Sequence, residues 1–133
     1  MKKLIFILAA AVTLVACEKD KNAKDFKGTY SGTFRTKQDG KMVMTDTELI
    51  LLNGNFEVKK GPKLGSGSFK LEDKRKVTFS DKNVWPADFD WNLILNGSYT
   101  YQALGDSLIL TRVLSATTPI DNNYYQYRLK QLN

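Results

Sequence analysis

The stretch GTYSGTFRTKQDGKMVMTDTELILLNGNFEV, residues 28–58, decides the fold because two turns within it give registers that can be compared. If Asp39-Gly40 forms a two-residue hairpin loop, Tyr30 lies opposite Leu49. If the later Asn-Gly pair does the same, Leu49 lies opposite Val58. Both turns thus place these three residues in one row of a three-stranded antiparallel sheet, which is the agreement that a real register requires.

The second half of the chain shows the same period-two alternation. The segments SFKLE, residues 68–72, and KVTFS, residues 76–80, predict a hairpin with its apolar side chains on one face. Gly105-Asp106 predicts another hairpin, in which Tyr101 faces Leu110.

The turn at Asn96-Gly97 allows two interpretations. A two-residue loop would pair Leu95 with Ser98 and so mix apolar with polar side chains. A three-residue loop pairs Leu95 with Tyr99 and puts Gly97 at a positive φ, so we expect this loop to follow a strand that ends at Leu95.

With a last strand at residues 124–132, these segments amount to about eight or nine strands in a single domain, residues 27–133. The expected fold class is all-β, an antiparallel up-and-down meander closed into a small barrel, since closure removes the free edges of a long meander. A two-sheet sandwich is the alternative, because the sequence does not identify the pair of strands that would close the barrel.

The first 16 residues have the pattern of a signal peptide. Lys2 and Lys3 precede LIFILAAAVTLVA, residues 4–16, a run that would span about 20 Å as a helix, too short for a hydrocarbon core of roughly 30 Å. We therefore expect residues 1–16 to be removed. Their removal lowers the formal net charge from +6 to +4, and the interspersed charges indicate no nucleic-acid partner.

Cys17 directly follows this run and is the only cysteine, so it has no disulfide partner, and the chain has no histidine to activate it. Leu14-Val15-Ala16-Cys17 resembles the lipobox of bacterial lipoproteins. The resemblance implies cleavage before Cys17, lipidation of its thiol and acylation of the new amino terminus, for instance with palmitate. The expected location is the bacterial cell envelope, anchored by lipid in the outer membrane and facing the periplasm or the cell surface.

Residues 17–26 are expected to be the lipidated cysteine and a flexible tether. Glu18-Lys19-Asp20 is similar to the lysine-and-acid signal that follows the cysteine in some surface-exposed lipoproteins of the Bacteroidota. A plain charged tether has the same composition.

The residue types exclude most catalytic sites. Without histidine, Ser-His-Asp and Cys-His catalysis are excluded, zinc lacks its usual ligands, and no Walker or Rossmann phosphate loop occurs. Paired carboxylates occur at Asp46 with Glu48 and at Asp88 with Asp90, where we expect solvated acids rather than a glycosidase pair. We predict no enzyme activity, cofactor or metal.

Aromatic residues supply the candidate binding site. NVWPADFDW, residues 83–91, concentrates them in one connection, where they form either a lip at the barrel mouth or a plug at the end of the core. Tyrosines on the inward faces either line a semi-polar cavity or are ordinary strand formers. The candidate ligand-binding residues are Trp85, Phe89, Trp91, Tyr99, Tyr101, Tyr125 and Tyr127.

The strand layout resembles that of a small lipocalin-like, or calycin, barrel. Gly28-Thr29-Tyr30 is similar to the Gly-x-Trp at the start of the first strand in that family, with tyrosine in place of tryptophan. Arg128 resembles the arginine that packs across that ring. The resemblance implies a structural pair of Tyr30 and Arg128 and a ligand bound inside the barrel.

The sequence thus predicts a membrane-anchored, non-enzymatic binding module for a small apolar or amphipathic ligand. The alternative is a protein-interaction module, such as an inhibitor or an accessory subunit of an envelope complex. A void inside the barrel would favour the ligand, whereas a filled interior would favour the protein partner.

The substitution Cys17→Ser tests the anchor. We expect the variant to lose incorporation of labelled palmitate and to leave the membrane fraction, because serine offers no thiol for the lipid and the acyl chains provide the membrane affinity. Continued labelling and membrane partition of the variant would contradict the lipobox assignment.

Overall fold

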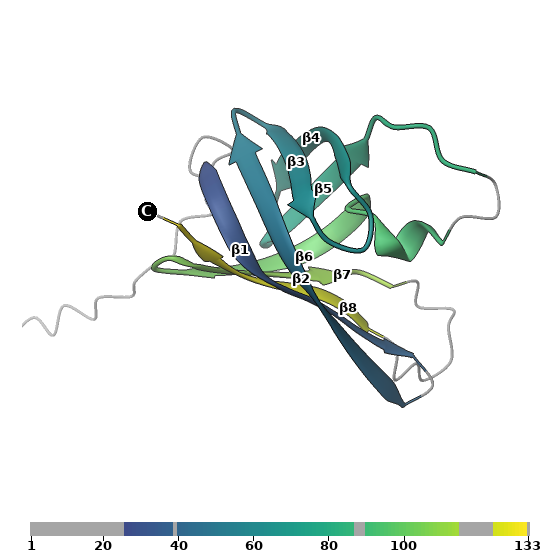
Figure 1. Cartoon of the computed structure of the whole chain (residues 1–133). Helices are drawn as coiled ribbons and strands as arrows, with labels where there is room; N and C mark the ends of the chain where they lie inside the picture. Colours follow the sequence, from purple (N-terminus) through teal and green to yellow (C-terminus); the bar gives the residue numbers. More distant parts are fainter. Residues whose placement is uncertain (1–25, 39, 87–89, 115–123, 133) are drawn as a thin grey trace, which may run out of the picture.

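The computed structural model describes residues 26–38, 40–86, 90–114 and 124–132 and shows eight strands closed into one barrel in sequence order (Figure 1). The strands are β1 (Gly28–Gln38), β2 (Lys41–Leu52), β3 (Asn55–Lys60), β4 (Gly65–Glu72), β5 (Lys76–Asp81), β6 (Gly97–Leu104), β7 (Ser107–Arg112) and β8 (Tyr124–Gln131). A 3₁₀ helix, η2 (Trp91–Leu93), lies between β5 and β6.

Each strand pairs antiparallel with the next, and β8 pairs with β1 along Tyr30–Lys37. This last pair closes the barrel, so the up-and-down meander is confirmed and the sandwich alternative is wrong. The expected row is also confirmed, because Tyr30 lies opposite Leu49 and Leu49 lies opposite Val58.

The hairpins expected in the second half of the chain are confirmed at β4–β5 and β6–β7. The prediction of a strand that ends at Leu95 is wrong. The 3₁₀ helix η2 forms there instead, and β6 begins at Gly97, which pairs with Phe79 of β5. One cause is local, because the Asp90 carboxylate accepts a hydrogen bond from the Asn92 N–H at 3.0 Å and caps a helical turn.

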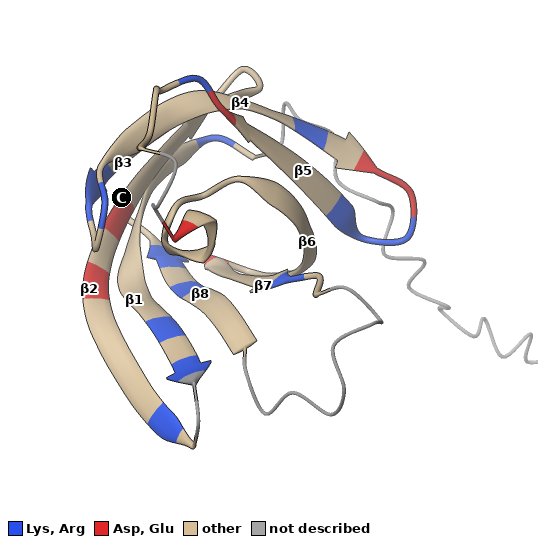
Figure 2. Ribbon diagram, turned by 90° about the vertical axis from the view of Figure 1, so that its right-hand side faces the viewer, with Lys and Arg blue, Asp and Glu red and all other residues tan. Residues whose placement is uncertain are grey.

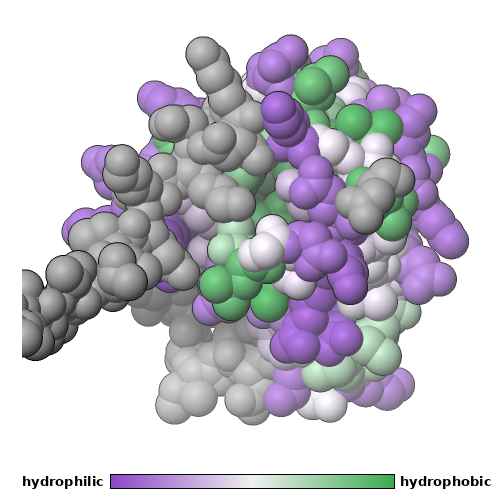
Figure 3. Space-filling model, turned by 90° about the vertical axis from the view of Figure 1, so that its left-hand side faces the viewer, coloured by the Kyte–Doolittle hydropathy of each residue, from purple (hydrophilic) through white to green (hydrophobic). Residues whose placement is uncertain are grey.

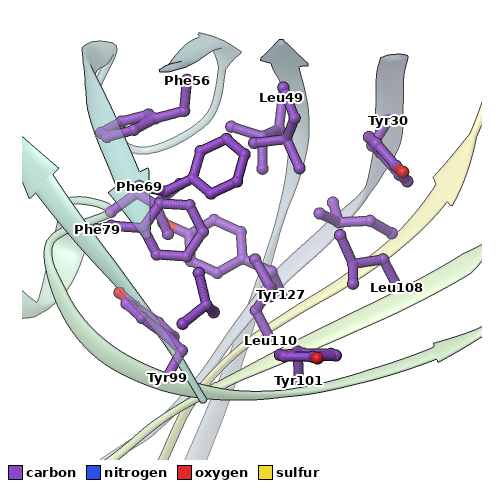
Figure 4. Close-up of a cluster of buried hydrophobic side chains, with 14 of the residues drawn as sticks. Tyr30, Leu49, Phe56, Phe69, Phe79, Tyr99, Tyr101, Leu108, Leu110 and Tyr127 are labelled. Carbon is purple, nitrogen blue, oxygen red and sulfur yellow. The ribbon is translucent and has the colours of Figure 1, made fainter. Parts of the chain in front are cut away.

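The barrel interior is filled by side chains from the inward faces of all eight strands (Figure 4). The ring of Phe79 lies 5.5 Å from those of both Phe56 and Tyr99, and the Tyr99 ring lies 6.2 Å from that of Tyr127. Edge-to-face contacts of this kind add about 0.5–1.5 kcal/mol each beyond the burial of apolar area. The described inward side chains therefore form one packed core along the barrel.

Two inward-facing glycines let neighbouring strands approach closely. A Cβ at Gly32 would collide with the carbonyl oxygen of Arg128, and one at Gly67 would collide with that of Ser80. Because backbone atoms occupy both positions, only glycine fits, and the strands can bend there as a small barrel requires.

Phe26 fills the end of the barrel at which the chain enters. Its side chain is 1% exposed, and its ring lies 5.0 Å from that of Tyr101 and 6.2 Å from that of Phe69. The residue belongs to the core although it precedes β1.

The substitution Phe26→Ala should therefore lower the free energy of unfolding by about 3–5 kcal/mol, the usual cost of deleting a buried aromatic ring. Urea denaturation measures this change. Lys27→Ala is the control, because Lys27 is exposed and its replacement should cost no more than about 0.5 kcal/mol. Equal effects of the two substitutions would contradict the role of Phe26 as a core residue.

Candidate functional site

The two ends of the barrel differ in their connections. Tight turns of two or three residues join the strands at the end where Phe26 enters, here called the closed end. At the other end, here called the loop end, residues 82–96 join β5 to β6 and residues 113–123 join β7 to β8 (Figure 1). Because binding residues concentrate on loops that a rigid scaffold positions, the loop end is the candidate site.

The connection 82–96 is tied to the barrel at both of its ends by Asp81. The Trp85 indole N–H donates to the Asp81 carboxylate at 2.9 Å, and the Asn83 backbone N–H donates to the same oxygen at 2.7 Å. The side-chain oxygen of Asn96 accepts from the Asp81 backbone N–H at 3.0 Å. Asp81 is thus a structural anchor for the loop.

Arg112, at the end of β7, holds η2 across the barrel opening (Figure 2). Its Nη2 donates to the carbonyl oxygens of Ile94 at 2.9 Å and Trp91 at 3.2 Å and to the Tyr99 hydroxyl at 2.8 Å. Its guanidinium carbon also lies 5.0 Å from the centroid of the Tyr99 ring, a cation–π distance. These hydrogen bonds give partners to carbonyl groups at the end of the helical turn, where the helix itself offers none. Such partners are needed here because Ile94 and Leu95 are both buried.

The structure corrects the expected pair of Tyr30 and Arg128. Tyr30 is buried in the core, whereas Arg128 is exposed on the outer face, opposite Thr33 of β1. Alternation along β8 is the reason, because Arg128 lies between the inward-facing residues Tyr127 and Leu129.

The four tyrosines proposed for the ligand site all face inward, as the alternation predicted. Tyr99, Tyr101, Tyr125 and Tyr127 are buried in the same core cluster, which also includes Phe34. The structure thus brings them together as packed side chains. Their role towards a ligand stays a prediction.

The aromatic residues of the connection 82–96 lie apart from that cluster. Trp85 is half-buried beside Asp81, and the Trp91 side chain is 46% exposed. Neither belongs to the core, so the interpretation of Trp85 as a core plug is wrong and both indoles lie at the loop end. Phe89 lies outside the described residues.

Burial shifts the ionisation of two of the inward-facing tyrosine hydroxyls. Burial raises the pKa of Tyr99 to about 12, although the neighbouring Arg112 guanidinium lowers it. Burial also raises the pKa of Tyr127 well above its ordinary value. Both hydroxyls therefore stay protonated at neutral pH.

The acidic residues considered as catalytic pairs have different places in the structure. Asp90 is the N-cap of η2, Asp46 lies on the outer surface 3.9 Å from Lys60, and Asp88 lies outside the described residues. No group of three or more His, Cys, Asp or Glu side chains is placed to hold a metal ion in the part of the chain that the structure describes. Within the same ranges, no helix has the length and apolar character needed to cross a membrane.

Arg112 is the site residue that sequence reasoning missed. The strand alternation contains its signal, because Arg112 falls on the same inward face as Leu108 and Leu110. An arginine at the end of an inward-facing row must find hydrogen-bond acceptors, since an unpaired buried charge is costly. The carbonyl groups of η2 supply those acceptors.

No protein-family model, no curated protein and no solved structure matches this chain. The eight-stranded antiparallel meander is compatible with a lipocalin-like fold.

Stability is expected to fall between pH 10 and pH 12. Folding raises the pKa of Tyr99 from 10.0 to about 12, so in this interval the unfolded chain releases a proton that the folded protein retains. The stabilisation is complete below pH 10 and is lost as the pH rises through the folded value, at about 1.4 kcal/mol per pH unit for one such group.

Urea denaturation at successive pH values measures this slope. Tyr99→Phe is the matched variant, because it keeps the ring but has no hydroxyl to ionise, so its slope should be shallower. Equal slopes in the two proteins would rule out Tyr99 as the source.

Proposed function

We propose that this protein is a lipid-anchored lipoprotein of the bacterial cell envelope whose barrel binds a partner protein through its loop end. The anchor is the acylated Cys17, joined to the barrel by residues 18–25, because Phe26, which we expected in the tether, is a core residue. The observation that carries the proposal is the separation of the two ends, because the chain enters at the closed end and the long connections lie at the other. The tether would therefore hold the closed end towards the membrane and leave the loop end accessible.

A partner protein is favoured over a small ligand because the inward side chains are already packed on one another. Tyr99 and Leu110 in the middle of the barrel are each 0% exposed, so an interior ligand would have to displace side chains of this kind. Grooves lined by described residues open on the outer surface. One of about 480 Å³ lies beside β2–β4 and one of about 510 Å³ lies at the β4–β5 turn.

Apolar side chains on the loop-end connections support a protein contact. Leu64 is 61% exposed, Val84 is 97% exposed, and Trp91 and Val113 are 46% and 45% exposed. Aromatic and aliphatic side chains of this kind form the buried centres of protein interfaces. Figure 3 shows the closed end, where apolar side chains also lie among hydrophilic ones.

Photo-crosslinking in the bacterium that makes the protein tests this proposal. A photoreactive amino acid in place of Val84, at the loop end, should give a discrete product with an envelope protein. The same amino acid in place of Leu104, which is 67% exposed at the closed end, is the matched control and should give little of that product.

Equal yields from the two positions would overturn the proposal, as would the absence of a product from Val84. Native mass spectrometry of residues 18–133 purified from the same cells separates the two candidate partners. A co-purifying small molecule without crosslinking at Val84 would support the ligand instead.

A further inference from the structure

The first half of β2 has a neighbouring strand on one edge only. β1 pairs with β2 up to the turn that joins them, but β3 pairs with β2 only along Glu48–Leu52. In the ranges that the structure describes, no strand pairs with the other edge of Lys41–Asp46. Figure 1 shows this end of the β1–β2 hairpin extending away from β3 and β4.

This free edge lacks most of the features that protect an edge strand. Alternate residues of an antiparallel strand direct their N–H and C=O groups to the same edge, so Lys41–Asp46 offers a row of main-chain groups there. The segment has no proline, and Met42, Val43 and Met44 are 52%, 55% and 58% exposed. A free edge with exposed apolar side chains is a template for another strand.

We propose that this edge pairs with the same edge of a second copy of the chain, antiparallel and centred on Met44. Met44 then faces Met44 of the second copy, Val43 faces Thr45 of the second copy, and Met42 faces Asp46 of the second copy. Alternate residues of a strand direct their N–H and C=O groups to the same edge. The main-chain groups of residues 42, 44 and 46 on the free edge therefore lie opposite those of residues 46, 44 and 42 of the second copy and can form hydrogen bonds with them.

One row of this register joins opposite charges, that of Lys37 and Asp46, and Asp46 also lies 3.9 Å from Lys60 of its own chain. Arg35 and Lys37 of β1 lie opposite Met44 and Met42, and Figure 2 shows the basic residues along β1 and at the tip of β2. Antiparallel pairing sets the two Lys41 residues at opposite ends of the ladder, whereas parallel pairing in register would set them side by side. It also places Asp46 of the second copy in the same row as Lys37, with Met42 between them.

The pairing has a consequence for the anchored protein, which rests on the proposed function. The two closed ends lie at opposite ends of the pair, because the strands run antiparallel. Residues 18–25, which precede the buried Phe26, reach at most about 29 Å when extended. Each copy therefore carries its own tether at its own closed end, and both anchors can enter one membrane where that membrane lies within this reach of both ends.

Single cysteines test the register. Residues 18–133 contain every strand and the β1–β8 pair but lack Cys17, so the variant Met44→Cys has one thiol. A two-fold axis at Met44 brings the two Cα atoms to about 5.5 Å, within the range that a disulfide spans. We expect oxidised glutathione to give a covalent dimer on non-reducing gels that a reducing agent dissociates.

Met42→Cys is the matched control, since Met42 is similarly exposed and only two residues away. In the proposed register, residue 42 lies roughly 13 Å along the strand from residue 42 of the second copy, too far for a disulfide. The disulfide-linked dimer of the Met42→Cys variant should therefore form about tenfold more slowly than that of Met44→Cys, or not at all. Circular dichroism establishes that both variants keep the β spectrum.

Sedimentation equilibrium of unsubstituted residues 18–133 gives an independent measure. We expect a reversible dimer, and Met44→Lys should shift it to monomer because two like charges would face each other. A monomer at every concentration, or equal oxidation rates of the two cysteine variants, would overturn the proposal. Crosslinking from Val84 is a separate readout, so failure of the dimer and failure of the loop-end proposal are distinguishable.

Discussion

The pairing of β8 with β1 is the interaction on which the rest of the structure depends. It joins Tyr30–Lys37 to the last strand and turns an open meander with two free edges into a closed barrel. It also brings the rings of Phe34 and Tyr127 to 4.5 Å from each other, so the core is continuous across the closure. The chain extends this contact past β8, since the Leu132 N–H donates to the Thr29 carbonyl at 2.7 Å.

The hairpins could be predicted from the sequence because a short turn fixes the register of the strands on either side of it. Asp39-Gly40 and Gly105-Asp106 each determine which side chains face inward, and the period of two then carries that choice along both strands. The closing pair could not be predicted in this way, because no turn joins β8 to β1. Its register is set by how the whole core packs, which also explains why the sandwich remained open as an alternative.

The segment before β6 could not be predicted for a different reason. Leu93, Ile94 and Leu95 form a short apolar run, and such a run fits a strand or a buried turn equally well. The outcome depends on the Asp90 cap and on Arg112, which reaches the Ile94 carbonyl from 18 residues away. The predicted arginine–aromatic pair failed for the same reason, since the partner of an aromatic ring depends on tertiary packing that a short motif does not contain.

The placement of the candidate site follows from chain direction rather than from the sequence of the loops. In an up-and-down barrel, every connection after an odd-numbered strand lies at the end opposite the start of β1. The long connections 82–96 and 113–123 follow β5 and β7, so the start of β1 is at the opposite end of the barrel whatever those connections contain. A filled core makes this separation rigid, because the inward side chains are packed independently of the loop sequences. The alternation of the strands therefore predicts the inward faces and the end at which the long connections lie, whereas the identity of the proposed partner depends on loop side chains that the alternation does not constrain.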